Sequence, residues 1–309
     1  MNELGRFLVK RTLTMVVTLL VIITITFIMM HAIPGGPFTR EKALPEAVLE
    51  ALNQKYHLDD PLWKQYVDYV KGVLTFNLGP SFQRAGVTVN QLIKEGFPAT
   101  LKIGLASVLV IIVVGIPLGI ISALKQNKWQ DGLVMFIATL GVTIPSFVMA
   151  TGIIYIFSAK YNVLPSNGLT TWKHMIGPVI ALSGFSLSFV ARLTRSSMLE
   201  VLQQDYIRTA RAKGLSNNKV IYKHALKNAL IPVVTYMGPM IASLLTGSFV
   251  IEKVFAIPGM GKHFVESVGN RDYTVLMGIT IFYALFLVVM VLLVDILYSV
   301  IDPRIKMED

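Results

Sequence analysis

The sequence predicts an all-α membrane protein with six spanning helices. Of its 309 residues, 54% are hydrophobic and only 15% are charged, whereas a soluble domain carries about a quarter charged residues. The apolar residues occur in long blocks, and the mean hydropathy is +0.63. A helix needs roughly 20 apolar residues to cross the hydrocarbon core of a bilayer. Six segments meet this requirement: 12–31, 100–124, 133–159, 176–196, 229–250 and 274–298.

The first apolar segment is predicted to be a span that stays in the protein. It runs from Thr12 to Met30, which is longer than the roughly 7–15 residues of a secretory signal core. No clear small-x-small cleavage site follows it. The chain has no Cys, which excludes disulfides and Cys-ligated metal sites but does not fix the compartment.

The distribution of Lys and Arg predicts the orientation. These residues are enriched in short cytoplasmic loops. With the N-terminus in the cytoplasm, 15 of the 28 Lys and Arg fall on that side, and the others are spread over longer outside loops. Six spans then return the C-terminus to the cytoplasm. The basic composition follows from membrane topology and is not evidence for nucleic-acid binding.

Residues 32–99 form the longest predicted outside loop and carry helical signals. Val48, Leu52 and Tyr56 recur at helical spacing. Asp60 is a suitable N-cap for a second helix, with Pro61 at its first position. One face of that helix would hold Leu62, Tyr66, Tyr69 and Val73, and a third short helix over 88–97 would be capped by Thr88. We predict a small helical cap; a poorly ordered loop is the alternative.

Prolines interrupt the later predicted spans, at Pro117, Pro145, Pro178, Pro232 and Pro239. A proline in a span leaves a backbone carbonyl that neighbours or water must satisfy. Transport proteins tolerate such interruptions more often than passive anchors do. Simple kinks for helix packing are the alternative.

Motifs for nucleotide binding, metal binding and hydrolysis are incomplete. The segment IPGMGKHF (257–264) resembles part of a phosphate-binding loop, but Ala256 and His263 stand where that loop needs Gly and Ser or Thr. A tight external turn is predicted there. The five His lack the spacing of zinc ligands, and the chain has neither a His-Glu-x-x-His nor a Gly-x-Ser-x-Gly motif. We expect no catalytic residue, no metal site and no cofactor bound by this chain.

Asp295 is the notable charge within the predicted spans, near the inner end of the sixth. A carboxylate inside a membrane is by default a functional-site hypothesis. It would belong either to a proton path or to a structural pair with Arg192, Arg195 or the basic N-terminal cluster. A proton-coupled carrier usually needs more such groups at mid-membrane depth, so we favour the structural pair.

A basic segment, DYIRTARAKGLSNNKVIYKHALKNALIPVV (205–234), connects the fourth and fifth spans. Tyr206, Ile207 and Ala210 share one face of a predicted helix. Gly214 ends this helix, and Ser216 is a suitable N-cap for the next. A helix–Gly–helix element along the membrane suits docking against a soluble partner. Attraction of its Lys and Arg to anionic lipid head groups is the alternative.

This segment resembles the coupling loop of ABC-importer permeases, whose pattern is E-A-A-x-x-x-G followed further on by I-x-L-P. Arg208, Thr209, Ala210 and Gly214 occupy the E, A, A and G positions. His224 and Lys227 stand where Ile and Pro would be, and only Leu226 matches that end. The stretch DYIRTARAKGL…HALKNALIPV is similar to the variant found in the peptide-importer branch.

The resemblance extends over nearly the whole chain. It is carried by HAIPGGPF, HLDDPLWKQYVDYVKG, LGPSF, FPATL, TGSFVIEKVFAIPGMGKHFVESVGNRDYTVLMG and VDILYSVIDPRIK. These segments are similar to the first of the two permease subunits of bacterial oligopeptide importers. The resemblance implies the type I permease fold of ABC importers. The domains would be 1–31 (cytoplasmic N-terminus and first span), 32–99 (extracellular helical insert), 100–302 (five-span core with a cytoplasmic coupling loop at 197–228) and 303–309 (cytoplasmic tail).

The resemblance also implies partners and a location. The chain would lie in the bacterial cytoplasmic membrane with a second, homologous permease. Two ATPase subunits would hold ATP and magnesium, and an extracellular binding protein would deliver oligopeptides. Dipeptides, nickel or another small solute are alternative substrates. The helix at 206–215 would fit a groove on one ATPase, through Tyr206, Arg208, Thr209, Ala210, Arg211, Lys213, Gly214 and Leu215.

Small and polar residues in two spans indicate a candidate peptide path. They are Thr235, Pro239, Ala242, Ser243 and Thr246 in the fifth span, with Pro145, Ser146 and Met149 in the third. Close helix packing is the alternative explanation. Two other classes of protein remain as rivals: an ATP-independent secondary transporter, and a membrane scaffold or sensor that holds a soluble partner through the basic segment.

Overall fold

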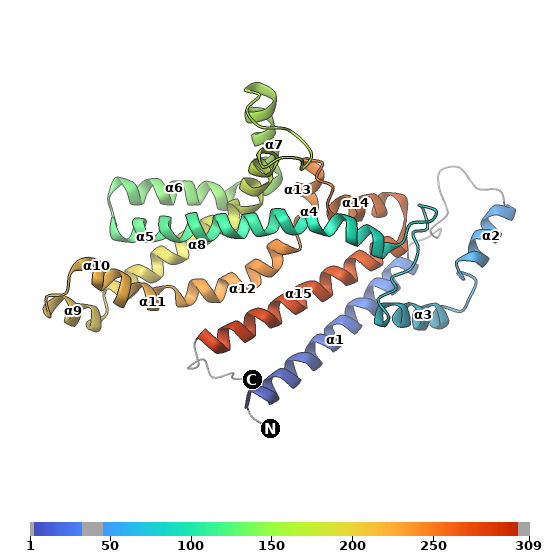
Figure 1. Cartoon of the computed structure of the whole chain (residues 1–309), viewed down its shortest axis with the longest axis horizontal. Coiled ribbons are helices and arrows are strands. Elements are labelled where there is room, and N and C mark those ends of the chain that lie inside the picture. Colours follow the sequence, from blue (N-terminus) through green and yellow to red (C-terminus); the bar gives the residue numbers. More distant parts are fainter. Residues whose placement is uncertain (1–2, 33–45, 302–309) are drawn as a thin grey trace. The chain divides into compact units, whose positions relative to one another are not determined.

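The computed structural model describes residues 3–32 and 46–301, and every named element among them is a helix (Figure 1). The predicted all-α class is therefore confirmed. Most of the HAIPGGPF segment and the tail at 303–309 lie outside the described residues. Contacts divide the chain into two compact units. The first unit contains the described residues up to Ala99 together with Pro258–Leu292, and the second contains Thr100–Ile257 and the end of the last helix.

The first unit is built around two long apolar helices. Its elements are α1 (Glu3–Ala32), α2 (Glu46–Lys55), α3 (Leu62–Leu74), the start of α4 (Val89–Val110), α14 (Met260–Asn270) and α15 (Tyr273–Ile301). Phe27 and Met30 of α1 are buried with Tyr273 and Met277 of α15. The ring of Phe97 from α4 stacks edge-on to Phe282 and Phe286 of α15, with centroids 4.9 and 5.0 Å apart. Apolar contacts thus join α1 and the start of α4, near the N-terminus, to α15, near the C-terminus.

The second unit is organised around one central helix, α8 (Lys173–Leu202), which packs against α5, α6, α7 and α12. Its other elements are the end of α4, α5 (Ile116–Leu124), α6 (Trp129–Thr143), α7 (Ser146–Ile153), α9 (Asp205–Ala212), α10 (Asn217–Lys219), α11 (Leu226–Ala229), α12 (Ile231–Leu245) and α13 (Phe249–Val254). A Cβ atom at Gly119 would lie 2.5 Å from the carbonyl oxygen of Ala191. This glycine therefore lets α5 approach α8 closely, as small residues do in membrane proteins.

Five of the six predicted spans are confirmed as single apolar segments. By length and composition they are Val9–Ala32, Val89–Leu124, Lys173–Leu202, Ile231–Val254 and Tyr273–Val294. The predicted span at 133–159 is a bent pair of helices, in which Trp129–Thr143 and Ser146–Lys160 meet at an angle of 105°. Pro145 explains the break. A proline disfavours helical backbone in the preceding residue, and Ile144 is extended, with a ψ of 120°.

Two other prolines lie where the helix geometry changes. Pro117 is the second residue of α5, directly after a π-helical turn at Ile111–Gly115. Pro232 is the second residue of α12. A proline is accepted in the first turn of a helix because its missing N–H has no intrahelical partner there. Pro178 and Pro239 lie inside α8 and α12.

The outer segment differs in detail from the prediction. The first two predicted helices correspond to α2 and α3, but α3 begins one residue later than expected. Asp60 does not cap α3 with its side chain; its carboxylate lies 2.9 Å from Nζ of Lys64. Thr88 accepts a hydrogen bond from the N–H of Gln91, as a cap does. The helix that follows is not short, because it continues without a break into the second span.

Candidate functional site

The basic segment folds as a short helix, a glycine turn and a second helical stretch, as predicted. Helix α9 ends at Ala212, and Gly214 follows with a left-handed φ of 73°. Left-handed backbone is readily available to Gly and costs other residues energy. The second stretch begins at Asn217 and continues through a π-helical turn into α11. Ser216 precedes it with extended backbone, but its side chain caps no N–H.

One face of α9 is anchored in the second unit. Ile207 is fully buried and Ala210 is buried, in a cluster with Met198 of α8 and Ala123 of α5. Val220, Ile221, Ala225 and Ala229 complete this cluster from the second helical stretch. Burying one Ile side chain contributes about 1.5–3 kcal/mol. The cluster therefore fixes α9 to the ends of α5 and α8.

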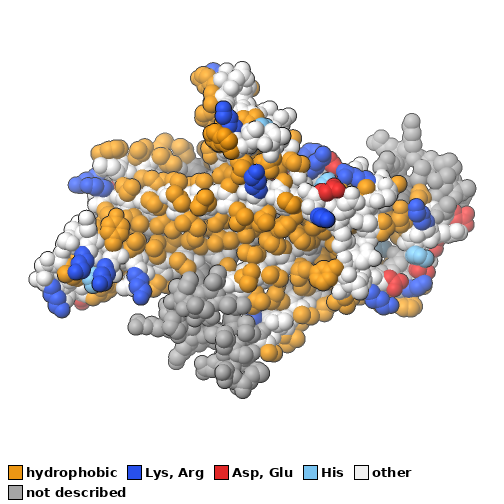
Figure 2. Space-filling view, viewed as in Figure 1, with side chains coloured by type: hydrophobic (Ala, Val, Ile, Leu, Met, Phe, Trp, Pro, Cys, Tyr) orange, Lys and Arg blue, Asp and Glu red, His pale blue; other side chains and the backbone are white. Residues whose placement is uncertain are grey.

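The opposite face of α9 is polar and exposed. Arg211 and Lys213 are exposed, and Figure 2 shows Lys and Arg side chains gathered over this end of the second unit. Arg208 lies 3.4 Å from Asp205, but the two side chains are 73% and 97% exposed, so this pair contributes little to stability. The hydroxyl of Tyr206 accepts a 2.8 Å hydrogen bond from Asn228, which links the two helical stretches.

The structure separates the eight predicted coupling residues by exposure. Six are exposed: Tyr206, Arg208, Thr209, Arg211, Lys213 and Gly214. Leu215 is half-buried and packs against the cluster beneath α9. Ala210 is 6% exposed and faces the interior of its own chain. It can hold the helix in place but offers almost no surface to a partner.

A buried ion pair supports the frame on which α9 is anchored. Asp131 of α6 accepts bonds from Nε and Nη2 of Arg195 in α8, at 2.7 and 2.8 Å. It also accepts from the Ser122 hydroxyl and, at 2.9 Å, from the N–H of Asn127. Asp131 is 4% exposed. A carboxylate and a guanidinium bound through two parallel bonds form a strong, directional contact.

Two of the partners proposed for Asp295 have other contacts, while the pairing of Asp295 itself stays a prediction. Arg195, one of the three proposed partners of Asp295, binds Asp131 instead. Arg192 donates a 2.6 Å hydrogen bond to the Thr139 hydroxyl. Asp295 belongs to α15, but its side chain lies outside the described side chains. Sequence patterns do not single out Asp131, because a single acid near a span end is common in membrane proteins.

The predicted path residues fall on α7, its preceding turn and α12. Pro145 and Ser146 are exposed at the break between α6 and α7, and Met149 packs on Gly184 of α8. On α12, Thr235, Pro239 and Ser243 are exposed at a spacing of four residues and therefore share one face. Thr246 is half-buried. Ala242 is fully buried, so it lies off that face.

The hydroxyls on α12 are already satisfied in part by their own helix. Thr235 donates to the carbonyl of Ile231 at 3.0 Å, and Thr246 donates to that of Ser243 at 2.6 Å. Each hydroxyl oxygen keeps acceptor capacity. The exposed face of α12 thus offers acceptors and small side chains, which would accommodate a polar backbone with little demand on side-chain identity.

The segment that resembles a phosphate loop forms a turn and a helix start in the first unit. Gly259 precedes α14, and Met260 and Gly261 are buried in its first turn. Ala256, at the end of the second unit, has a left-handed φ of 48°. Among the described residues, no group of three or more His, Asp or Glu is placed to hold a metal ion.

The first unit contains a second buried aspartate, Asp272, beside a cavity of about 100 Å³. The Ser81 hydroxyl and the N–H of Phe82 donate to its carboxylate, the latter at 3.1 Å. His263 lines the same cavity with Arg84 and Glu266, which form a 2.6 Å ion pair. Burial, and then the nearby Arg84 charge, lower the pKa of His263. Its Nδ1 atom is buried and has no hydrogen-bond partner among the described residues.

Comparison with known protein families assigns the chain. The family described as binding-protein-dependent transport system inner membrane component matches residues 115–307. The N-terminal region described for the same kind of membrane component matches residues 4–104. The chain belongs to this family. The predicted family is thereby confirmed, and the five apolar segments and the bent pair are those of a multi-pass membrane component of a transport system.

Curated relatives match over almost the full length. The dipeptide transport system permease protein DppB of Bacillus subtilis (strain 168) is 49% identical over 304 residues, covering 98% of this chain and 99% of the relative. The oligopeptide transport system permease protein OppB of Salmonella typhimurium is 44% identical over 303 residues, covering 97% and 99%.

A solved structure supports the fold. A chain from the inward-facing MetNI methionine ABC transporter matches with a TM-score of 0.56 and 19% identity. The match covers 68% of this chain and 96% of that chain. The likeness confirms the predicted permease fold and carries no information on substrate.

Proposed function

We propose that this chain is a permease subunit of an ATP-driven peptide importer. It would form the translocation path with a second, homologous permease. Two ATPase subunits would bind on the cytoplasmic side, where both termini also lie, and an extracellular binding protein would deliver the peptide. The chain itself would carry no catalytic residue and hold neither ATP nor magnesium.

Two observations support this proposal. Relatives that are 49% and 44% identical over nearly the whole chain are named as permeases for dipeptides and oligopeptides, so peptides are the substrate class we favour. The observation that carries the coupling role is the geometry of α9. Its buried face is fixed by Ile207 and Ala210, while Arg208 and Arg211 are presented outward.

The coupling mechanism follows from this placement. A rigid docking helix transmits force only if it cannot slide on its own subunit. The anchoring of α9 to Met198 of α8 and Ala123 of α5 meets this condition. Movement of the ATPase would then displace α8, the central helix of the second unit. ATP shifts the permease between states only as far as its affinity differs between them.

The first experiment is gentle affinity purification of the chain from its native membrane, followed by identification of the proteins that accompany it. We expect a second six-span permease, ATPase subunits and ATP hydrolysis. We also expect peptide uptake by the reconstituted complex that stops when ATP is withheld. A chain that purifies alone and moves solute without ATP would overturn the proposal in favour of a secondary transporter.

Gly214 provides a matched test of the docking surface. No atom lies within 4 Å of a Cβ built at this position, so a substitution acts through the turn and the partner rather than through internal clashes. Gly214→Leu should cost about 1–2 kcal/mol in the left-handed turn and lower ATP-linked uptake while the complex still assembles. Gly214→Asn, which tolerates this backbone, should retain more uptake. Equal uptake by both variants and the wild type would contradict docking through this turn.

A further inference from the structure

Helix α3 has an apolar stripe that the described residues of its own unit leave uncovered. Trp63, Val67, Val70 and Leu74 recur at spacings of four, three and four residues, so they form one line along the helix. Trp63 is 69% exposed, Val67 39% and Leu74 74%, and Val70 is half-buried. Phe76, directly after the helix, is 74% exposed. Such a stripe in water is unfavourable, since each Å² of apolar surface costs about 25 cal/mol.

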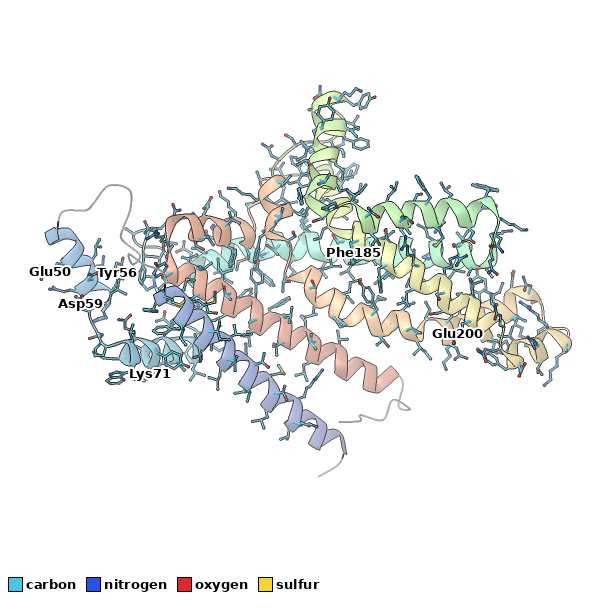
Figure 3. All side chains as sticks on the ribbon, turned by 180° about the vertical axis from the view of Figure 1, so that it is seen from behind. Glu50, Tyr56, Asp59, Lys71, Phe185 and Glu200 are labelled. Carbon is cyan, nitrogen blue, oxygen red and sulfur yellow. The ribbon has the colours of Figure 1, made fainter. Side chains whose placement is uncertain are left out.

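The neighbouring face of α3 packs against α1. In Figure 3, α3 is the helix labelled at Lys71, beside the end of α1. The hydroxyls of Tyr66 and Thr24 are 2.7 Å apart. The Tyr66 ring packs edge-on to that of Phe27, with centroids 5.4 Å apart. His31 and Gln65 are joined by a 3.2 Å contact between Nε2 and Oε1. These contacts place α3 along the last two turns of α1.

That position corresponds to the edge of a bilayer. The candidate span in α1 is Val9–Ala32, which is about 36 Å long at 1.5 Å per residue, whereas the hydrocarbon core is about 30 Å thick. Thr24 lies eight residues before Ala32, about 12 Å from the end of the span. A centred span would project about 3 Å beyond the hydrocarbon on each side, so Thr24 would lie about 9 Å inside it and His31 just outside. The contacts of α3 with α1 therefore straddle the boundary between hydrocarbon and lipid head groups.

Paired charges lie beside the stripe of α3, with Lys64 2.9 Å from Asp60 and Lys71 3.6 Å from Asp68. Lys64 and Lys71 each follow a residue of the stripe, so they lie next to it, on the side away from α1. Their side chains are 48% and 70% exposed. Lysines that flank an apolar stripe can lay their stems on hydrocarbon and keep the ammonium group among head groups. Tryptophan is enriched at the same level of the membrane.

We propose that α3 lies in the membrane surface, with the stripe of Trp63, Val67, Val70 and Leu74 inserted among the lipids beside α1. Lipid would cover this stripe, because the stripe lies beside the exposed apolar side chains of the span in α1. Ile25 and Ile28 of α1, which directly follow the residues that hold α3, are 51% and 59% exposed. An apolar stripe beside a charged face is also the pattern of helices that bind in the interface plane.

Spin labelling tests this placement, since the chain has no Cys of its own. Val67→Cys and Leu74→Cys would carry a nitroxide on the stripe. Lys64→Cys and Asp68→Cys would carry it on the polar side of the same helix. The membrane complex that contains each variant is reconstituted in liposomes, and the same complex without the introduced Cys gives the background. The measurement is relaxation of the nitroxide by oxygen, which concentrates in lipid, and by a water-soluble nickel chelate.

We expect the ratio of oxygen to nickel accessibility to be severalfold higher at positions 67 and 74 than at 64 and 68. Equal access of the nickel chelate to all four positions would overturn the proposal, because the stripe would then face water. Low access of both reagents at 67 and 74 would also overturn it, because a protein partner would then cover the stripe. These surface positions leave the Tyr66 contacts with α1 intact, so folding does not limit the test.

Discussion

Among the described residues, each compact unit buries one aspartate between segments distant in sequence, and the two aspartates have different hydrogen-bond partners. In the second unit, Asp131 binds the guanidinium of Arg195 through two bonds, 64 residues away along the chain. In the first unit, Asp272 accepts only from neutral groups in the contacts described above. Its donors include the Ser81 hydroxyl, 191 residues away, and the Phe82 N–H.

This difference predicts how each region responds to a change. A buried charge pair is costly to break, because removing one partner leaves the other charge buried without compensation. A carboxylate held by several neutral dipoles loses them one at a time, and each is worth about 1 kcal/mol. The frame beneath α9 should therefore fail as a unit, whereas the turn at 80–84 should loosen gradually.

Asp131→Asn should have the largest effect. The substitution keeps the shape of the side chain but leaves Arg195 without a negative partner, at a cost of about 3 kcal/mol. Arg195 and Met198 are one turn apart on α8, so the loss should also loosen the cluster that anchors α9. The measurement is the thermal midpoint of the detergent-purified complex, together with ATP-linked uptake.

The control for this prediction is a double-mutant cycle. Combining Asp131→Asn with Arg195→Met removes both charges, and the double variant should be more stable than the sum of the two single effects predicts. Additive losses would show that the two residues do not interact and would contradict the buried pair.

Asp272→Asn should have a smaller effect, about 1–2 kcal/mol. The amide retains one acceptor oxygen, while its NH2 group meets donors that formerly bound a carboxylate. The local result should be faster proteolysis in the turn at 80–84, which Asp272 holds through Ser81 and Phe82. Asp68→Asn is the matched control, because Asp68 is 57% exposed and should change stability very little. A loss as large as that of Asp131→Asn would remove the distinction between the two regions.

Local signals in the sequence account for most of the fold. Long apolar runs predict five of the spans, because the requirement for about 20 apolar residues is a property of each segment by itself. Gly214 and Thr88 are found for the same reason, since capping and left-handed turns depend on adjacent residues. The bend at Pro145 also has a local cause, because a proline disfavours helical backbone in the residue before it. The sequence predicts an interruption at Pro145, but the size of the bend, 105°, depends on how the two helices pack.

The contacts that the sequence could not supply are those between distant segments. Arg195 of α8 pairs with Asp131 of α6, which also binds Ser122 of α5, and no local pattern links these three residues. Ala210 was placed on the docking surface by the position of the motif, and packing puts it inside. Periodicity identifies a helical face without stating what covers it. What covers a helical face depends on tertiary packing. The stripe of α3 is therefore seen only in the structure.

The smallest expected effect concerns acid sensitivity, which should belong to the first unit. Burial and the Arg84 charge lower the pKa of His263, with Lys262 acting in the same direction and Glu266 and Glu95 opposing them. The folded state thus favours the neutral ring, and stability is fully present above the unfolded value of 6.5. As the pH falls below that value, the unfolded state binds more protons, so stability decreases.

His263→Gln cannot titrate and should lose less thermal stability between about pH 7 and pH 5.5 than the wild type. Asp131→Asn should keep the wild-type pH profile from a lower starting point, because its ion pair is in the other unit. A wild-type loss that persists unchanged in His263→Gln would assign the acid sensitivity to another group.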